Sequence, residues 1–195
     1  RGIPCFELET VWKRKKSICT SRTFGEELYH FNQLAQAMST YATMCGAKLR
    51  RQGSCARSVT IFILTNPFKQ QYCVNYKGIR SIRLNTPTND SLEIVSATIT
   101  GLRSIYRNDC IYKRAGVIVS DIVPQSQVQL SFFDDIVDIE KRHRLMLAVD
   151  TVNESFGQMK IYLAINGLER KWKPKQERLS PRYTTRMDEL ISVGA

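Results

Sequence analysis

Alternating apolar and polar residues predict four β-strands in the first 122 residues of the chain. In the second of these strands Val59, Ile61 and Ile63 fall on one face, while hydroxyl-bearing and aromatic residues alternate with them. Turn-forming residues end the first two strands, namely Gly25 and the pair Asn66-Pro67. The predicted strands cover residues 17–24, 57–65, 80–84 and 115–122.

Apolar residues at helical spacing predict two helices between these strands. The first covers residues 31–51 and is closed by Gly53. The second begins after Asp90, a favourable N-cap residue, and Glu93 three positions later completes a capping box. Each helix is predicted to bury one stripe: Leu34, Met38, Tyr41, Cys45 and Leu49 on the first, and Leu92, Val95, Ile99, Leu102 and Tyr106 on the second.

The order βαββαβ predicts an α+β fold, a four-stranded sheet that carries two helices on one face. The other face of this sheet is expected to stay open. Small hydroxyls interspersed with cations suit a surface that lies along phosphates. The outward candidates on the open face or its rim are Ser21 or Arg22, Thr60, Arg83, Lys113 and Arg114.

The pattern changes after residue 122, where a linker over 123–138 leads into a small α/β C-terminal unit over 139–195. A unit of this size is marginal alone, so we expect it to pack on another surface. The pattern within it predicts a strand at 159–165 and a helix at 140–153 whose apolar face carries Leu145, Val149 and Val152.

The charge of the chain is strongly uneven. The formal net charge is +11, and residues 1–120 carry 18 Lys or Arg against 7 Asp or Glu, whereas residues 121–195 carry 11 of each. This distribution favours a polyanion-binding first part. A basic surface that serves only solubility is the alternative.

Composition argues against several other classes of protein. No apolar run reaches the roughly 20 residues of a membrane span, and no signal peptide follows Arg1. Because the chain does not begin with Met, we expect it to be part of a longer protein. The two histidines, His30 and His143, are too far apart to suggest a zinc site. The six cysteines form no C-x-x-C pair and are expected to be buried thiols in a reducing cytosol, with a catalytic Cys–His pair as the alternative: Cys5, Cys19, Cys45, Cys55, Cys73 and Cys110.

An apolar peptide interrupts the otherwise polar linker. Gln129-Leu130-Ser131-Phe132-Phe133 precedes the carboxylate pair Asp134-Asp135. An exposed leucine beside two aromatic residues is typical of a docking peptide, because their burial on a partner supplies most of a modest affinity. A last strand of the preceding domain is the alternative.

Several strings of residues are more specific than these patterns. Lys16-Ser17-Ile18 with Arg22-Thr23, and the string at 112–117, resemble the first and last strands of the little-finger domain of Y-family DNA polymerases. The strings at 21–26, 84–91 and 179–186 are similar to the UmuC family, the catalytic subunits of bacterial DNA polymerase V. Residues 1–5 resemble the stretch that follows the thumb domain in this family. The resemblance covers essentially the whole chain.

This resemblance implies a fragment of a translesion polymerase, with a leading segment at 1–16 and a little-finger domain at 17–122. The palm, fingers and thumb, with the carboxylates that hold Mg²⁺ for nucleotidyl transfer, would precede residue 1. We therefore expect no catalysis and no cofactor in the fragment itself, although the parent would be a DNA polymerase. Asp134-Asp135 lies in a linker rather than on a rigid element, and we interpret it as a solvated flank.

The resemblance further implies that the little finger holds primer–template duplex by backbone contacts in the major groove. Such contacts suit a lesion-tolerant enzyme, which must not depend on normal base shape. A solvated hinge is the alternative for the basic run 13–16. The candidate DNA-binding residues are Lys16, Ser17, Ser21, Arg22, Thr23, Arg57, Thr60, Arg83, Lys113 and Arg114.

The linker peptide is similar to the Q-L-[SD]-L-F peptide that binds the bacterial sliding clamp, with Phe132 in place of the usual leucine. Gln129 would bind at the pocket mouth, while Leu130 and Phe133 fill the groove. Contacts with a UmuD-type accessory subunit or a RecA filament are family-level expectations. The family also implies a role in DNA repair and SOS mutagenesis. The expected location is the bacterial cytoplasm, at the nucleoid and without a membrane partner. The alternative function is a free-standing RNA-binding or regulatory module with a ferredoxin-like sheet.

The clamp interpretation predicts that Leu130→Ala combined with Phe133→Ala abolishes binding to the bacterial sliding clamp, because both groove-filling side chains are lost. Surface plasmon resonance on immobilised clamp measures this, and duplex DNA binding by the same variant serves as the control. Unchanged clamp affinity would show that the peptide is not the tether.

Overall fold

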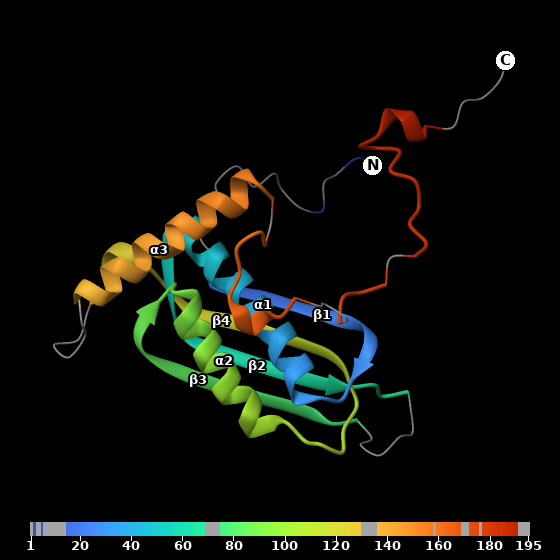
Figure 1. Cartoon of the computed structure of the whole chain (residues 1–195), viewed down its shortest axis with the longest axis horizontal. Coiled ribbons are helices and arrows are strands. Elements are labelled where there is room, and N and C mark those ends of the chain that lie inside the picture. Colours follow the sequence, from blue (N-terminus) through green and yellow to red (C-terminus); the bar gives the residue numbers. More distant parts are fainter. Residues whose placement is uncertain are drawn as a thin grey trace.

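The computed structural model describes residues 2, 5, 15–68, 75–129, 136–157, 159–168, 172–175 and 177–190. Within these ranges, helices and strands alternate in the order that the sequence pattern predicts (Figure 1). The elements are β1 (Ser17–Leu28), α1 (Phe31–Arg51), β2 (Ser54–Thr65), β3 (Lys77–Thr88), α2 (Ser91–Ile105), β4 (Tyr112–Pro124) and α3 (Ile136–Ser155), with short 3-10 turns at Gln125–Gln127, Ala164–Asn166 and Met187–Glu189.

The four strands form one antiparallel sheet in the order β1-β4-β2-β3. β4 pairs antiparallel with both β1 and β2, so β1 and β2 run parallel with β4 between them. The connection through α1 therefore crosses over β4, and the connection through α2 crosses over β2. Both helices cover the same face of the sheet (Figure 1). The predicted fold class, an α+β sheet with one open face, is confirmed.

The core lies between this sheet and the two helices. All five apolar residues predicted for the stripe of α1 are fully buried, and so are Val59, Ile61 and Ile63 of β2. Tyr41, Cys45 and Leu49 pack in the core beneath the helix. The last turn of α1 carries cationic residues. One-sided burial of this kind leaves the opposite face of the sheet without a helical cover.

The start of α2 corrects two details of the prediction. Asp90 is the N-cap, and its carboxylate accepts a hydrogen bond of 2.9 Å from the Leu92 amide. The capping box is wrong, because the Asp90 amide donates to the Thr88 hydroxyl rather than to Glu93. Leu92 is 39% exposed, and Ile94 is buried in its place. At the start of α2 the buried face of the helix is therefore rotated relative to the predicted stripe.

Each strand is longer than its sequence pattern predicts. β1 does not stop at Gly25 but continues to Leu28, after a register irregularity between Thr23 and Leu28. The glycine serves a different purpose there, since a β-carbon on it would clash with the carbonyl oxygen of Lys173. A close approach of two backbones, rather than a turn, explains Gly25.

The C-terminal part departs furthest from its prediction. α3 is longer at both ends than the predicted 140–153. Among its described side chains Met146 is the buried one, while Leu145 is 52% exposed. The strand predicted at 159–165 is wrong, because these residues form a loop that ends in a 3-10 turn. The pattern misled because this loop contacts α1 instead of pairing with a strand.

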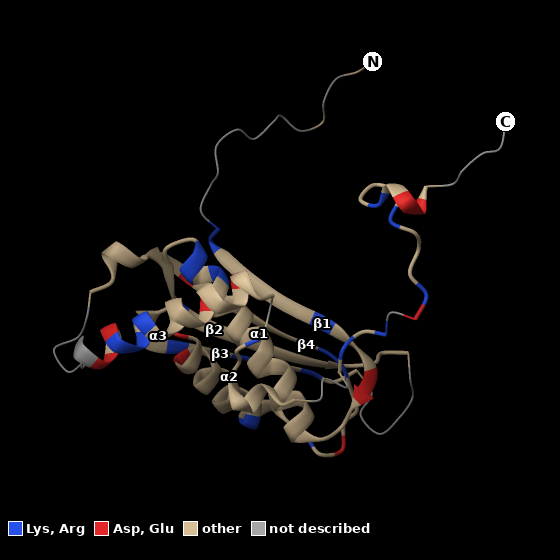
Figure 2. Ribbon diagram, turned by 45° about the horizontal axis from the view of Figure 1, so that its top comes forward, with Lys and Arg blue, Asp and Glu red and all other residues tan. Residues whose placement is uncertain are grey.

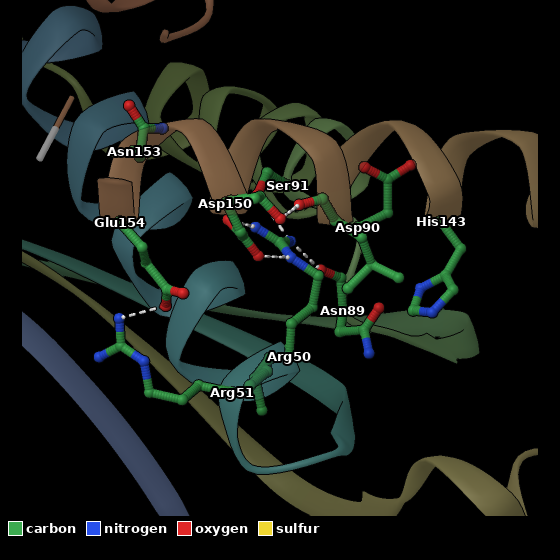
Figure 3. A network of polar contacts seen from close by, with 12 residues as sticks. Arg50, Arg51, Asn89, Asp90, Ser91, His143, Asp150, Asn153 and Glu154 are labelled. Carbon is green, nitrogen blue, oxygen red and sulfur yellow. Dashed lines mark hydrogen bonds and ion pairs between the residues drawn. The ribbon is translucent and has the colours of Figure 1, made fainter. Parts of the chain in front are cut away.

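A buried arginine joins α3 to the rest of the fold (Figure 3). The Arg50 guanidinium donates to both carboxylate oxygens of Asp150, over 2.6 and 2.8 Å, and also to the Asn89 carbonyl and the Ser91 hydroxyl, over 2.6 and 3.0 Å. The Arg50 side chain is 2% exposed and that of Asp150 22%. A bidentate pair of this kind ties α1, α3 and the start of α2 together.

A second arginine, Arg142 of α3, reinforces this junction from the other side of the α2 N-terminus. It lies 3.6 Å from Asp90 and 3.4 Å from Glu93, and it also pairs with Asp138 one turn earlier. The hydrogen bond from Arg142 lowers the pKa of the Asp138 carboxyl below its usual value. Glu93 thus contacts α3 instead of capping its own helix.

We predict that Asp150→Ala lowers the free energy of unfolding by about 3 kcal/mol, because it leaves the buried Arg50 guanidinium without its anion. Glu154→Ala, one turn later on α3, is the matched control: it removes the pair with Arg51, whose side chains are 62% and 70% exposed. That loss should not exceed about 0.5 kcal/mol. Urea unfolding followed by circular dichroism compares the two, and equal losses would contradict the role of Arg50.

Candidate nucleic-acid interface

The open face of the sheet is built from four transverse rows of side chains, which the strand register aligns. The row through the centre of the face runs through Ser21, Gly116, Phe62 and Ile79 on β1, β4, β2 and β3. The rows on either side place Cys19, Ile118, Thr60 and Ser81 together, and Thr23, Arg114, Leu64 and Lys77 together. The fourth row joins Ser17, Ser120, Ser58 and Arg83.

Hydroxyl groups form hydrogen bonds within and between these rows. Thr60 donates to the Ser81 hydroxyl over 3.0 Å, and the hydroxyls of Ser58 and Ser81 lie 3.2 Å apart. On the other side of the face, Arg114 donates to the Ser21 hydroxyl over 3.2 Å. Because a guanidinium has five N–H donors, Arg114 keeps most of them available to a ligand. The face therefore offers fixed hydrogen-bond donors on a rigid sheet.

The charge of the open face is of one sign. Its four rows include Lys77, Arg83 and Arg114 and contain no Asp or Glu. All three cations are at least partly exposed. In Figure 2 α3, which carries several acidic residues, lies on the side of helices α1 and α2. This arrangement can attract and position a polyanion.

A single aromatic residue lies within the four rows. Phe62 rests on Gly116 of the neighbouring strand, because a β-carbon at that position would clash with the Phe62 ring and lie 2.5 Å from Cβ of Ser21. The Phe62 ring therefore lies over β4, beside Ser21 of β1.

The structure brings most of the predicted residues together. Lys16 is exposed just before β1, Lys113 lies at the irregularity of β4 opposite Leu64 and Thr65, and Arg57 is exposed on β2 beside the irregular pairing of β2 with β3. The predicted residues that lie in the four rows are Ser17, Ser21, Thr23, Thr60, Arg83 and Arg114.

Arg22 lies on the helix side of the sheet, away from the open rows. It pairs with Ala115, whose side chain is fully buried under the helices, whereas its neighbours Ser21 and Thr23 belong to the open rows. Burial raises the pKa of the Tyr41 hydroxyl on α1, and the positive charge of Arg22 opposes this rise. The alternative that the sequence left open, Ser21 or Arg22, is resolved in favour of Ser21 for the open face.

Four residues of the face were missed as candidates. Ser58 and Ser81 carry hydroxyls in the cross-linked rows, while Ser120 and Lys77 complete the outer rows. The alternation within each strand already indicated that Ser58 and Ser81 point outward. Only the pairing between strands shows that they lie beside Thr60 and Arg83.

The cysteines show no catalytic arrangement in the part of the chain that is described. The Cys45 thiol donates to the Thr20 hydroxyl over 3.3 Å, and burial raises its pKa, so it stays protonated and poorly nucleophilic. The prediction of buried thiols holds for Cys45 and Cys55, but Cys5 and Cys19 are exposed and Cys110 is disulfide-bonded, while Cys73 lies outside the described residues. The described residues include no group of three or more His, Cys, Asp or Glu that could hold a metal ion.

Two further features bear on the predicted partners. Gln129, the first residue of the predicted clamp peptide, is exposed, whereas Leu130, Phe132 and Phe133 lie outside the described residues. Among the helices that the structure describes, none is long and apolar enough to cross a membrane.

Comparison with known families divides the chain into two matched regions. Residues 15–132 match the impB/mucB/samB family C-terminal domain. Residues 143–193 match a domain of unknown function (DUF4113). The first match includes every strand of the sheet.

The chain is also similar to individual proteins. It is 36% identical over 195 residues to protein UmuC of Salmonella typhimurium, which covers 99% of this chain and 46% of UmuC. It is 26% identical over 143 residues to DNA polymerase IV of Desulfatibacillum aliphaticivorans, which covers 73% of this chain and 34% of the polymerase. Among solved structures, the insertion ternary complex of Dbh DNA polymerase is similar with a TM-score of 0.41 and 8% identity, over 55% of this chain and 29% of that one. The chain thus spans less than half the length of the two curated relatives.

The contact between Gly116 and Phe62 is testable by a double-mutant cycle. Gly116→Ala should lower the free energy of unfolding by about 1–3 kcal/mol, because the new methyl group displaces the Phe62 ring and crowds Ser21. On a Phe62→Ala background the same substitution should cost clearly less. Thermal unfolding of the four proteins measures the coupling, and strictly additive losses would contradict the contact.

Proposed function

Because the chain belongs to the impB/mucB/samB C-terminal domain family, and is similar to UmuC over nearly all of its length, we propose that it is the DNA-gripping and clamp-tethering part of an error-prone Y-family translesion DNA polymerase. The parent protein would supply nucleotidyl transfer from palm and fingers domains with Mg²⁺. The part described here would hold the primer–template duplex while damaged DNA is copied during repair and SOS mutagenesis.

The observation that carries this proposal is the open face of the sheet. Its rows combine hydroxyl groups with three cations, contain no carboxylate, and are fixed by the pairing of four strands. Phosphate oxygens accept hydrogen bonds from hydroxyls and guanidinium groups alike. Because the sheet holds these donors in fixed positions, they can bind a duplex in one defined orientation relative to the sheet.

Contacts of this type also suit the proposed task. Hydroxyl groups, lysine and arginine contact the regular phosphate backbone rather than base edges. An enzyme that copies lesions gains from a grip that is independent of sequence and of base shape. The binding energy should then come mainly from counterion release, which makes it sensitive to salt.

The remaining partners belong to the same proposal. The peptide that begins at Gln129 would tether the polymerase to the bacterial sliding clamp, as its similarity to clamp-binding peptides supports. A UmuD-type accessory subunit and a RecA filament would contact the parent protein in the bacterial cytoplasm, at the nucleoid. Tethering raises the local concentration of a weakly held polymerase on its template.

A single-stranded RNA-binding module remains the alternative, and the open face favours duplex DNA over it. Such modules stack two or three bases on aromatic side chains of the sheet. In the four rows Phe62 is the one aromatic residue, and it lies low over Gly116. Duplex DNA and single-stranded RNA of equal length, titrated in the same assay, discriminate the two functions.

We predict that Arg83→Ala with Arg114→Ala weakens duplex binding by a similar factor on unrelated sequences. The slope of log affinity against log salt concentration should fall by about 1 for each cation removed, because each releases fewer counterions. Fluorescence anisotropy over a range of NaCl concentrations measures both quantities. Arg103→Ala with Arg144→Ala, which removes two exposed cations from α2 and α3, is the matched control. An unchanged slope in the first variant would refute the open face as the grip.

A further inference from the structure

The C-terminal part of the chain is neutral as a whole, but its charges are separated along the sequence. Residues 121–169 carry 4 Lys or Arg against 8 Asp or Glu, whereas residues 170–186 carry 7 Lys or Arg and one Glu. We call residues 172–175 and 177–186, the described part of this basic stretch, the basic arm. The acidic residues before it include the partners that hold α3 in place, such as Asp150.

The basic arm has irregular structure, with a hydrogen-bonded turn at residues 182–186. It contains no helix or strand among its described residues, and Pro174 and Pro181 disfavour both. Apart from Trp172, all of its described side chains are exposed, and they include five cations: Lys173, Lys175, Arg178, Arg182 and Arg186. The arm therefore presents these cations to solvent.

One residue fixes the start of the arm to the fold. Trp172 is 4% exposed and packs edge-on against Tyr41 of α1, with ring centroids 5.4 Å apart and an interplanar angle of 82°. Its carbonyl oxygen accepts a hydrogen bond of 3.5 Å from the Gly25 amide. Because Gly25 has no side chain, the backbone of Lys173 and Lys175 can lie directly against β1.

This anchor places the first cations of the arm at the border of the candidate interface. Gly25 lies on β1 two residues after Thr23, which belongs to the open rows together with Ser21. Figure 2 shows basic segments of the arm beside this end of β1. Arg22 is exposed and points to the helix side of β1, the side on which Tyr41 and Trp172 pack.

The cations of the arm are largely available to a ligand. Lys175 lies 3.6 Å from Glu26, but the two side chains are 56% and 59% exposed, so this pair is weak. Arg182 and Arg186 share Glu189. For Lys173 and Arg178 the described residues provide no ion-pair partner.

We propose that the basic arm is a second contact for the phosphate backbone of nucleic acid, continuous with the open face at the edge of β1 and held there by Trp172. This inference rests on the proposed function and extends it to the region that matches a domain of unknown function. It also assigns a role to Arg22, which belongs to this second contact instead of the open face.

The alternative occupant of the arm is an acidic protein surface, and two observations favour nucleic acid over it. The arm begins where the candidate duplex interface ends, so one continuous polyanion can contact both. Its exposed apolar residues, Leu179 and Tyr183, stand four positions apart without forming the buried cluster that anchors a protein interface.

The test uses the whole chain and a fluorescent duplex with a single-stranded overhang, titrated at several NaCl concentrations. The arm variant is Lys173→Gln, Lys175→Gln and Arg178→Gln together. We expect its salt slope to fall by up to about 3, with a loss of affinity of roughly tenfold or more at low salt. The matched control removes three exposed cations from α3 and the loop after it, by Lys141→Gln, Arg144→Gln and Lys160→Gln, and should keep the wild-type slope.

The outcomes separate this inference from the proposed function. If the arm variant keeps the wild-type slope while Arg83→Ala with Arg114→Ala lowers it, the arm proposal fails and the proposed grip stands. If the wild-type chain does not bind duplex at all, both fail. An arm variant that behaves like the matched control overturns the inference even if the arm proves to bind an acidic protein.

The anchor has a separate readout, because the chain contains only two tryptophans, Trp12 and Trp172. In a Trp12→Phe background the emission of Trp172 should be that of a buried indole. Gly25→Ala should displace the arm, shift this emission to longer wavelength and lower the salt slope as the arm variant does. If the tryptophan emission of this variant stays at short wavelength and its salt slope is unchanged, the anchor does not position the arm.

Discussion

The structure depends on the insertion of β4 between β1 and β2, with antiparallel pairing on both sides. This pairing forces the connections through α1 and α2 to cross over a strand, and both crossovers lie on the same face of the sheet. The apolar stripes of the two helices are therefore buried on that face alone. The open face and its aligned rows follow from the same pairing, because β4 fixes the register of its neighbours.

The junction of α3 with this unit is of a different kind. It relies on Arg50 and Arg142, which reach carboxylates on α3 and at the start of α2, rather than on a continuous apolar stripe. Directional, bidentate contacts of this type define one position for α3. The later segment packs on α1 through the loop that ends in Ala164–Asn166, and then through Trp172, which contacts Tyr41 and the backbone of Gly25. The basic arm continues from Trp172.

Local pattern was sufficient wherever a segment makes its own regular structure. The stripe of α1 agrees with the structure at every predicted position, and the N-cap at Asp90 does as well. Prediction failed where the position of a residue depends on a contact with a part of the chain that is distant in sequence. Glu93 contacts Arg142 of α3 instead of its own helix end, and Gly25 accommodates Lys173 instead of ending a strand. The loop at 159–165 has the alternation of a strand but packs on α1.

The sequence by itself determined the order of the elements, the one-sided sheet, the excess of positive charge in the first part and the resemblance to a polymerase family. These depend on local periodicity, composition and strings of adjacent residues. Only the tertiary structure decided which candidates share a surface. Strand pairing placed Ser21 beside Arg114 and turned Arg22 to the helix side, since successive residues of a strand face opposite ways. Likewise, the packing of Trp172 on Tyr41 brought a basic segment about 150 residues downstream to the edge of β1, a proximity that no local pattern encodes.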